Sequence, residues 1–531
     1  MGETRARAVL WAAILGSGIV FLDSTVVNVA LAQIGQQLPH SLVGVFEGQS
    51  YVYNGYLLTL SALLVLAGAL TDAYGRRRMF ALGLAGFGAT SLLCGLAPSM
   101  ELLIVFRLVQ GAAGALLVPG SLALITTTFR GEEQGRAFGL WAGASAATSI
   151  LGPFVGGLLV QLVSWRAAFL LNVPFLIVAL WLTLRYVPES REPRAGRRFD
   201  WLGAAVIAVA VGGLTFGAIY GQQRDWRDPL AFAALGVGAL ATIALPVLMA
   251  TRPNPLVPLD LFRSRNFSVT NLSTLLIYGA LYVNFFFQAL FAQGVLGYSP
   301  SAAGLLGVPG SLLLALFSAR FGVLGARYGQ RRFMAVGPAV MAVGVLWLAR
   351  VPATSPAWQL RPDQPASFLP PGGYLLDFLP AALVFGAGLA MMVAPLTTAL
   401  MTSVPPSRAG LGSAINNAIS RVGPQLAGAA IFVAITSSFY AGIAGRVSGV
   451  DPASPSLRAA VAPLASPPAS LAPAVAAAAR DASTDAYHVA MLVSAGLLLA
   501  GALVNWLGIR TAGTARAVDA ADDSALTSPA D

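Results

Sequence analysis

Two oppositely charged side chains lie inside apolar stretches of the sequence that are long enough to cross a membrane. Asp23 comes about 14 residues into the first stretch, and Arg107 comes about six residues into the fourth. At 1.5 Å per residue, Asp23 is roughly 21 Å from the edge at which its stretch begins. The fourth stretch runs in the opposite direction, so Arg107 is roughly 9 Å from the other edge. The two side chains can therefore lie in one layer.

A carboxyl group in such a place can carry protons. An aspartate inside a membrane costs about 2.5–3.5 kcal/mol on insertion scales and usually faces a cavity or a partner. Apolar surroundings favour the neutral form of a carboxyl group, whereas a nearby arginine, which keeps its charge, favours the ionised form. Asp23 could thus load a proton on one side and release it on the other. In the structural alternative, Asp23 and the polar residues beside it only hydrogen-bond neighbouring helices.

A second group of side chains could line a route for an apolar molecule. Aromatic, amide and thioether groups can form an adaptable pocket, although at helical spacing they more often belong to the core or face lipid. Arg421 is the other charge inside a stretch, and it would either contact anionic groups or satisfy helix ends. Tyr278 belongs to the same aromatic group as the candidates. The pathway candidates are Asn28, Tyr56, Tyr282, Asn284, Phe286, Gln288, Met392 and Arg421.

Fourteen apolar blocks carry these residues. Of the 531 residues, 56% are hydrophobic and only 10% are charged, whereas soluble domains carry about 25% charged residues. The blocks lack the period-two alternation of barrel strands, so each is predicted to be a helix that satisfies its own backbone in lipid. The predicted spans are 9–31, 50–71, 79–97, 101–124, 137–160, 167–187, 200–220, 229–250, 267–291, 300–320, 333–350, 375–402, 410–440 and 486–508.

The arginines predict how these helices are oriented. All 32 basic residues are arginine, and the net charge is +10. Cytoplasmic loops are enriched in basic residues. A cytoplasmic N-terminus puts 22 arginines on that side, 8 outside and 2 within spans. We therefore expect a multi-pass protein of the cell membrane (plasma or inner) with both termini cytoplasmic. This arrangement accounts for the basic charge without a nucleic-acid partner.

Internal repeats divide the chain into two related halves. Each repeated motif occurs in two predicted helices whose positions in the chain order differ by eight. Two six-helix bundles alone would give a difference of six, so two extra helices are inserted between the bundles. Parallel repeats of this kind occur in carriers whose substrate site lies near the middle of the membrane. The repeats are GALTDAYGRRR (68–78) with GVLGARYGQRR (322–332), LVQGAA (108–113) with LVFGAG (383–388), and GPFVGG (152–157) with GPQLAG (423–428).

The predicted fold is an all-α integral membrane protein with fourteen transmembrane helices. It contains two pseudo-symmetric six-helix bundles plus two inserted central helices. The outer loop at 441–485, rich in Ala, Pro and Ser, could fold or remain disordered. The predicted units are a first bundle at 1–190, a cytoplasmic linker with the two extra helices at 191–265, a second bundle at 266–510, and a cytoplasmic tail at 511–531.

Several motifs together resemble one branch of the major facilitator superfamily, the fourteen-helix drug:proton antiporters of the EmrB/QacA type. They are FLDSTVVNVALAQI at 21–34, GALTDAYGRRR at 68–78, RLVQGAAGA at 107–115 and LGPFVGG at 151–157. The resemblance implies a proton-coupled exporter of apolar or cationic drugs that works by alternating access, with Asp23 and Arg107 in proton coupling. The alternative is a dedicated exporter of one metabolite, antibiotic, lipid or siderophore.

The resemblance also implies roles for two glycine-containing motifs. In the family, the loop between helices 2 and 3 is a latch that holds one state of the rocking cycle. Its second copy has Ala326 where the first has Asp72, so the latch should be one-sided. The exporter motif of the fifth predicted helix would form a seal and hinge, although close helix packing describes it equally well. The latch residues are Gly68, Asp72, Gly75 and Arg76, and the helix-5 motif residues are Gly152, Pro153, Gly156 and Gly157.

The sequence also argues against several other functions. It contains no Walker loop of the form G-x-x-x-x-G-K-[ST], so an ion gradient is expected to supply the energy instead of ATP. No clustered acid, base or nucleophile set occurs within the spans, so we expect no enzymatic activity, no cofactor and no metal site. The single cysteine, Cys94, is expected to pack in the core. The expected partners are a small-molecule substrate, protons and the lipid bilayer, and the protein is expected to act as a monomer.

Overall fold

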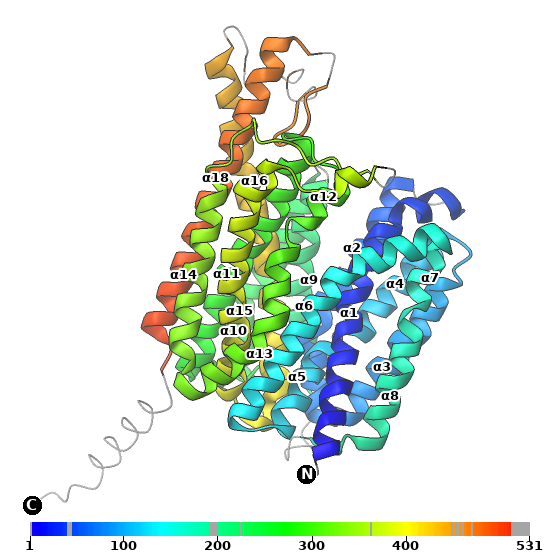
Figure 1. Cartoon of the computed structure of the whole chain (residues 1–531). Helices are drawn as coiled ribbons and strands as arrows, with labels where there is room; N and C mark the ends of the chain where they lie inside the picture. The colour runs from blue at the N-terminus through cyan, green and yellow to red at the C-terminus, as the bar shows by residue number, and fades with distance from the viewer. Residues whose placement is uncertain are drawn as a thin grey trace, which may run out of the picture.

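The computed structural model consists of helices and the loops that connect them, with no strand among the residues that it describes (Figure 1). The predicted tail at 511–531 lies outside the described residues. The described residues are 3–39, 45–191, 199–223, 226, 228–361, 364–447, 451, 454, 457, 461–468 and 471–510.

The first half of the molecule is a bundle built around the long helix α1 (Glu3–Gln37), which packs against most other helices of this half. Two predicted spans are each interrupted by a single residue, Leu116 in one and Leu171 in the other. The remaining helices of this half are α2 (Val45–Tyr74), α3 (Arg76–Gly95), α4 (Met100–Ala115), α5 (Leu117–Thr128), α6 (Gly131–Leu162), α7 (Trp165–Leu170) and α8 (Asn172–Tyr186).

The second half repeats this plan. Helix α11 (Arg265–Gly294) packs against the two longest helices of this half, and α15 packs against α13 and α14. A large apolar core of buried side chains connects these helices. The other helices are α12 (Pro300–Leu305), α13 (Val308–Tyr328), α14 (Gln330–Leu348), η3 (Tyr374–Phe378), α15 (Leu379–Thr402), α16 (Ala409–Arg446) and α18 (Pro473–Gly508).

The two inserted helices lie against the seam between the halves. Helix α9 (Trp201–Gln223) packs against α2 of the first half and α16 of the second. Helix α10 (Pro229–Thr251) packs on α9, and much of its surface is exposed, including Leu240 and Ile243. The insertion therefore adds to the outside of the bundle and leaves the contact between the halves to other helices.

The predicted spans agree closely with the helices. Among the described residues, thirteen helices are long and apolar enough to cross a membrane, and the 32-residue helix α6 covers the remaining predicted span. The largest boundary error is at α18, which begins at Pro473 and not at residue 486. Its first turns and the end of α16 project beyond the bundle (Figure 1), where Arg446 forms an ion pair with Asp485. Part of the outer loop is therefore helical.

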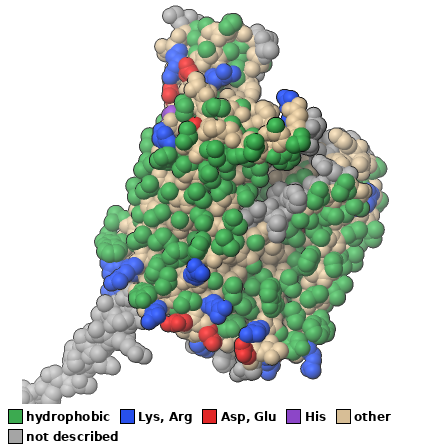
Figure 2. All heavy atoms as spheres, in the orientation of Figure 1, with side chains coloured by type: hydrophobic (Ala, Val, Ile, Leu, Met, Phe, Trp, Pro, Cys, Tyr) green, Lys and Arg blue, Asp and Glu red, His purple; other side chains and the backbone are tan. Residues whose placement is uncertain are grey.

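The surface matches a membrane-spanning bundle. Figure 2 shows a broad band of hydrophobic side chains across the face in view, with charged side chains gathered below and above it. Large apolar residues of the candidate membrane spans, such as Trp181, Leu240 and Leu316, are more than half exposed. Because such a surface is unfavourable in water, lipid is the medium that fits it.

The two halves meet closely at the end of the bundle where α1 begins and where the α2–α3 turn lies, here called the latch end (lower end in Figure 1). Three glycines on the first turns of α6, Gly135, Gly139 and Gly143, lie directly against the backbone of α13. A Cβ atom added at Gly139 would come within 2.6 Å of Ser318 O, and one at Gly143 within 2.9 Å of Ala315 O. Only glycine permits this approach, because any side chain would push the helices apart.

Candidate functional site

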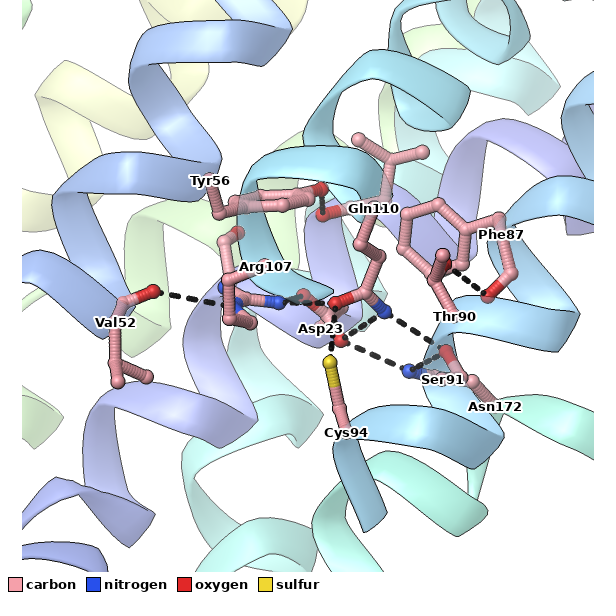
Figure 3. Close-up of polar contacts among 12 residues, drawn as sticks. Asp23, Val52, Tyr56, Phe87, Thr90, Ser91, Cys94, Arg107, Gln110 and Asn172 are labelled. Carbon is pink, nitrogen blue, oxygen red and sulfur yellow. Dashed lines mark hydrogen bonds and ion pairs between the residues drawn. The ribbon is translucent and has the colours of Figure 1, made fainter. Parts of the chain in front are cut away.

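Asp23 and Arg107 form an ion pair inside the first half (Figure 3). Arg107 Nη1 lies 2.5 Å from Asp23 Oδ2, and both side chains are 0% exposed. Arg107 also donates through Nε to Val52 O at 3.1 Å and through Nη1 to Gln110 Oε1 at 2.7 Å. The structure thus brings together the two charges that the sequence placed at one depth on α1 and α4.

Amide side chains complete the network around the carboxylate. Gln110 Nε2 lies 3.3 Å from Asp23 Oδ1 and 2.8 Å from Ser91 Oγ. Asn172 Nδ2 donates to Asp23 Oδ1 at 2.9 Å. Asp23 on α1 is therefore tied to α4 and α8, and through Ser91 the network reaches α3. Every partner of Asp23 donates a hydrogen bond, which is the pattern that an ionised carboxylate accepts.

Tyr56 covers the guanidinium of Arg107 from α2. The Arg107 Cζ atom lies 4.1 Å from the centre of the Tyr56 ring, a distance at which cations are attracted to aromatic faces. The Tyr56 hydroxyl donates to Val20 O at 3.1 Å. Arg107 Nη2 has no hydrogen-bond partner among the described residues. Since the pair is shielded from solvent, proton exchange at Asp23 requires the surrounding helices to move.

A cavity of about 380 Å³ lies between the two halves, close to this network. Phe21, Leu122 and Trp141 line it from the first half. Tyr278 and Arg421 line it from the second half. Phe21 is two residues from Asp23 on α1, and Trp141 Nε1 donates to Ser17 Oγ of the same helix at 2.6 Å. Helix α1 therefore separates the cavity from the buried ion pair and contacts both.

The pathway candidates fall in different places. Arg421 lines the central cavity, whereas Asn284 and Gln288 line a small separate cavity of about 20 Å³. Tyr56 and Met392 are each 0% exposed and line none of the described cavities. In this conformation the candidates thus lie at different places, and their role in a substrate pathway stays a prediction. The remaining candidates, whose side chains are exposed or half-buried and line no described cavity, are Asn28, Tyr282 and Phe286.

The α2–α3 turn joins the two halves through a second buried ion pair. Arg76 Nη2 lies 2.8 Å from Asp72 Oδ1, and both side chains are 3% exposed. Asp72 accepts from the backbone N–H groups of Gly410 (3.2 Å) and Leu411 (2.8 Å) at the start of α16. Arg76 donates to the carbonyl oxygens of residues 406 and 407 at 2.5 and 3.0 Å. The Asp72–Arg76 ion pair of the first half thus binds the N-terminal end of α16 in the second half.

The glycines of the two repeat copies are needed for different structural reasons. Gly75 has φ +110°, and Gly329 at the matching position of the second repeat has φ +90°, so both adopt backbone that favours glycine. A Cβ atom at Gly68 would lie 2.5 Å from Gly410 O, so glycine lets α2 approach α16. The second repeat has Ala326 in place of an aspartate, and there Gly322 lies closely against Gly135 of α6. The two sides of the latch end are thus held by different interactions.

Asp72→Asn is expected to weaken closure of the latch end. Asparagine keeps the shape but removes the charge that pairs with buried Arg76, and a hydrogen bond to a charged group contributes about 1.5–3 kcal/mol. We expect a roughly tenfold or greater fall in the latched population. We measure this through a cysteine introduced at Ser420 in a Cys94→Ser background, which is labelled by an impermeant maleimide added opposite the latch end. A smaller latched population should lower the labelling rate.

Glu189→Gln is the matched control for this prediction. Glu189 lies beside the same turn and caps α3 by accepting from the backbone N–H groups of Arg77 and Arg78 at 3.2 Å each. Its described hydrogen bonds and ion pair all lie within the first half, so its substitution should leave the labelling rate unchanged. Equal labelling rates in the Asp72 and Glu189 variants would contradict the account of the latch.

The helix-5 motif lies on α6 where this helix packs against α1. A Cβ atom at Gly152 would collide with the Thr25 side chain, and one at Gly156 would come within 3.0 Å of Val26 Cγ1. The surroundings of Pro153 and Gly157 lie outside the described part. The motif therefore packs α6 on the helix that carries Asp23, which is the close-packing interpretation of the sequence.

Three residues of the site were not singled out by the sequence analysis. Gln110 lies one turn after Arg107 on α4, so its position on the same helix face could have been foreseen. Asn172 and Ser91 come from distant helices, and only the fold brings them to Asp23. No group of three or more His, Cys, Asp or Glu residues that could hold a metal ion occurs among the described residues.

Comparisons with known proteins agree with the fold. The sequence model of the family described as Major Facilitator Superfamily matches residues 13–429. Among solved structures, the proton:xylose symporter XylE bound to 6-bromo-6-deoxy-D-glucose superposes with a TM-score of 0.56 at 15% identity. That match covers 93% of this chain and 95% of XylE, so it supports the fold and nothing finer.

Two relatives have higher sequence identity. The multidrug resistance protein Stp of Mycobacterium tuberculosis (strain CDC 1551 / Oshkosh) is 33% identical over 413 residues, which is 78% of this chain and 72% of Stp. The tetracenomycin C resistance and export protein of Streptomyces glaucescens is 32% identical over 430 residues, which is 81% of this chain and 76% of that protein.

Proposed function

The chain belongs to the major facilitator superfamily, and on this basis we propose that it is a proton-driven exporter of apolar, drug-like small molecules. Similarity to proteins named for multidrug resistance and for tetracenomycin C resistance and export supports the export direction. A cavity of about 380 Å³ between the halves is of drug-binding size. The protein is a multi-pass membrane protein, and transport, not catalysis, is its activity.

The buried Asp23–Arg107 pair is the observation that carries the proton-coupling part of the proposal. Protonation of Asp23 would neutralise the carboxylate and weaken the hydrogen bonds that hold α1 to α4 and α8, because a neutral carboxyl group is a poorer acceptor and one of its oxygens becomes a donor. Arg107 would keep its charge, so the pair would lose its main attraction. We infer that proton uptake releases α1, and that proton loss restores the network seen in the structure.

A continuous set of packed helices could carry this change to the latch end. Helix α1 packs on α6 at Gly152 and Gly156, and α6 packs on α13 at Gly135 and Gly139. A shift of α1 would therefore disturb α6 and with it the contact between the halves. We propose that residues 1–190 and 266–510 rock as two units, with 191–265 as the linker between them.

We propose further that the latch end faces the cytoplasm of the cell and that both termini lie there. The asymmetry in arginine number supports this orientation. In this orientation, the described conformation is closed towards the cytoplasm. A proton would then reach Asp23 from outside the cell. One proton crossing 100 mV releases roughly 2.3 kcal/mol, which sustains a substrate gradient of roughly 40- to 50-fold.

The test is dye accumulation in inverted membrane vesicles under an imposed proton gradient. Three apolar probes of different charge are compared, namely fluorescein (anionic), Nile red (neutral) and rhodamine 6G (cationic). We expect uptake of at least one dye that stops when a protonophore collapses the gradient. Failure to take up any of them, or uptake that survives the protonophore, would contradict proton-driven export.

A dedicated exporter of a single metabolite is the second candidate. The similarity to a tetracenomycin C resistance and export protein favours it. Drug susceptibility of cells that overproduce the protein separates the two candidates. Resistance to several unrelated compounds supports broad export, whereas resistance to one compound supports the dedicated exporter.

A further inference from the structure

The positively charged side chain of Arg421 lines the central cavity without a counter-ion among the described residues. Arg421 on α16 lines the cavity of about 380 Å³ and also an adjoining cavity of about 190 Å³ against α2 and α9. Among the described residues, no hydrogen bond or ion pair engages its guanidinium. The fully buried arginines, Arg107 and Arg76, are paired with Asp23 and Asp72. Partly buried Arg421 is thus a charge of this region that no described residue balances.

The rest of the cavity wall does not supply an anion. Its described lining contains apolar and aromatic residues, among them Phe21, Trp141 and Tyr278, and no Asp or Glu. The other polar side chains of the lining are all neutral, namely Ser145, Tyr278, Thr397, Asn416, Asn417 and Ser420. Asn416 is itself held by Asn271 Oδ1 at 3.1 Å and Thr274 Oγ1 at 2.8 Å. The wall therefore combines one fixed cation with neutral hydrogen-bonding groups and an apolar surface.

This combination favours one class of ligand. A guanidinium stays charged at all working pH values and binds planar oxyanions such as carboxylates through two parallel hydrogen bonds. Aromatic side chains bind the flat apolar body of a ligand. A cationic ligand would meet Arg421 with no carboxylate to offset the repulsion.

We propose, on the basis of the export function inferred above, that the substrate is an amphiphilic organic anion. Its carboxylate or similar oxyanion binds Arg421, and its aromatic body packs against Phe21, Trp141 and Tyr278. This replaces the cationic class that the sequence resemblance implied. Export of a monoanion with entry of one proton moves two charges per cycle, whereas a monovalent cation exchanged for a proton moves none.

Binding of two xanthene dyes to the purified full-length protein tests this assignment. Fluorescein and rhodamine 6G share a tricyclic ring with a phenyl substituent but carry opposite charges. We measure their dissociation constants by fluorescence anisotropy at one pH and ionic strength. We expect fluorescein to bind at least tenfold more tightly than rhodamine 6G to the wild type.

Substitutions on α16 test whether Arg421 causes the preference for fluorescein. Arg421→Gln is expected to weaken fluorescein binding at least tenfold and to strengthen rhodamine 6G binding, which also shows that the variant is folded. Arg421→Lys, which keeps the charge but loses the planar fork, should fall between wild type and Arg421→Gln. Arg446→Gln on the projecting end of the same helix is the matched control and should change neither constant.

Three outcomes would overturn the proposal. They are tighter binding of rhodamine 6G by the wild type, an equal loss of both dyes in Arg421→Gln, and no binding of fluorescein. The measurement needs no gradient, so it is separate from proton coupling. Fluorescein binding without proton-driven uptake would refute the proposed coupling and leave the anion site standing.

Discussion

Asp23→Asn is expected to abolish proton-driven transport while leaving substrate binding in place. Asparagine fits the space of Asp23 but cannot take up and release a proton. It also leaves the Arg107 guanidinium buried without its counter-ion, and breaking one side of a buried pair destabilises a protein by about 3–5 kcal/mol. We therefore expect a loss of gradient-driven dye uptake of at least roughly 100-fold and a lower unfolding temperature. Equilibrium exchange of labelled for unlabelled dye should continue.

The comparison of net uptake with exchange makes this result specific to coupling. A variant that had only unfolded would lose both activities. Asp485→Asn is the matched control, because Asp485 forms an ion pair with Arg446 on the exposed projection, and exposed pairs contribute about 0–1 kcal/mol. It should transport like the wild type. Full gradient-driven uptake by Asp23→Asn would remove this carboxylate from the mechanism.

Gly139→Leu is expected to prevent closure of the latch end and so to stop the transport cycle. A side chain at this position would enter the backbone of α13 next to Ser318 and Ala319. Overpacking of a close contact costs about 1–3 kcal/mol, which is a factor of roughly 5–150 in the population of the closed state. Because the obstacle is backbone that cannot rotate away, we expect an effect at the upper end of that range.

Transport and cysteine labelling together measure this effect. The variant should lose most dye uptake, and a cysteine introduced at Ser420 should react more slowly with maleimide added opposite the latch end. Gly236→Leu is the control, because Gly236 on α10 has no atom within 4 Å of an added Cβ. Normal transport by Gly139→Leu would show that the contact between α6 and α13 is not part of closure.

The helices could be predicted because lipid imposes a single solution on each apolar block. A segment that crosses hydrocarbon must satisfy its own backbone, so apolar length alone located the helices, with boundary errors of up to eight residues outside α18. The prediction was poorest at α18, which starts 13 residues before its predicted span. That part projects beyond the bundle and is rich in alanine, so apolar length carried no information about it.

The site was predictable in part for the same reason. A charge inside a membrane needs a partner, which pointed to Asp23 and Arg107. The neutral partners Asn172 and Ser91 carry no such penalty and could not be singled out. The sequence predicted α16 as a span and singled out Arg421 within it. It did not predict that Asp72 accepts hydrogen bonds from the first N–H groups of α16, or that Arg421 lines a cavity between the halves. Those positions depend on how the two halves meet, which no local pattern records.

Substrate-induced proton movement in proteoliposomes tests the central claim most directly. Purified wild-type protein is reconstituted with a pH-sensitive dye inside, and fluorescein, Nile red and rhodamine 6G are each presented on one side without an imposed gradient. The account predicts that transport of at least one probe drives protons in the opposite direction, and that Asp23→Asn abolishes this signal. Transport of a probe with no accompanying proton movement in the wild type would contradict proton-coupled export.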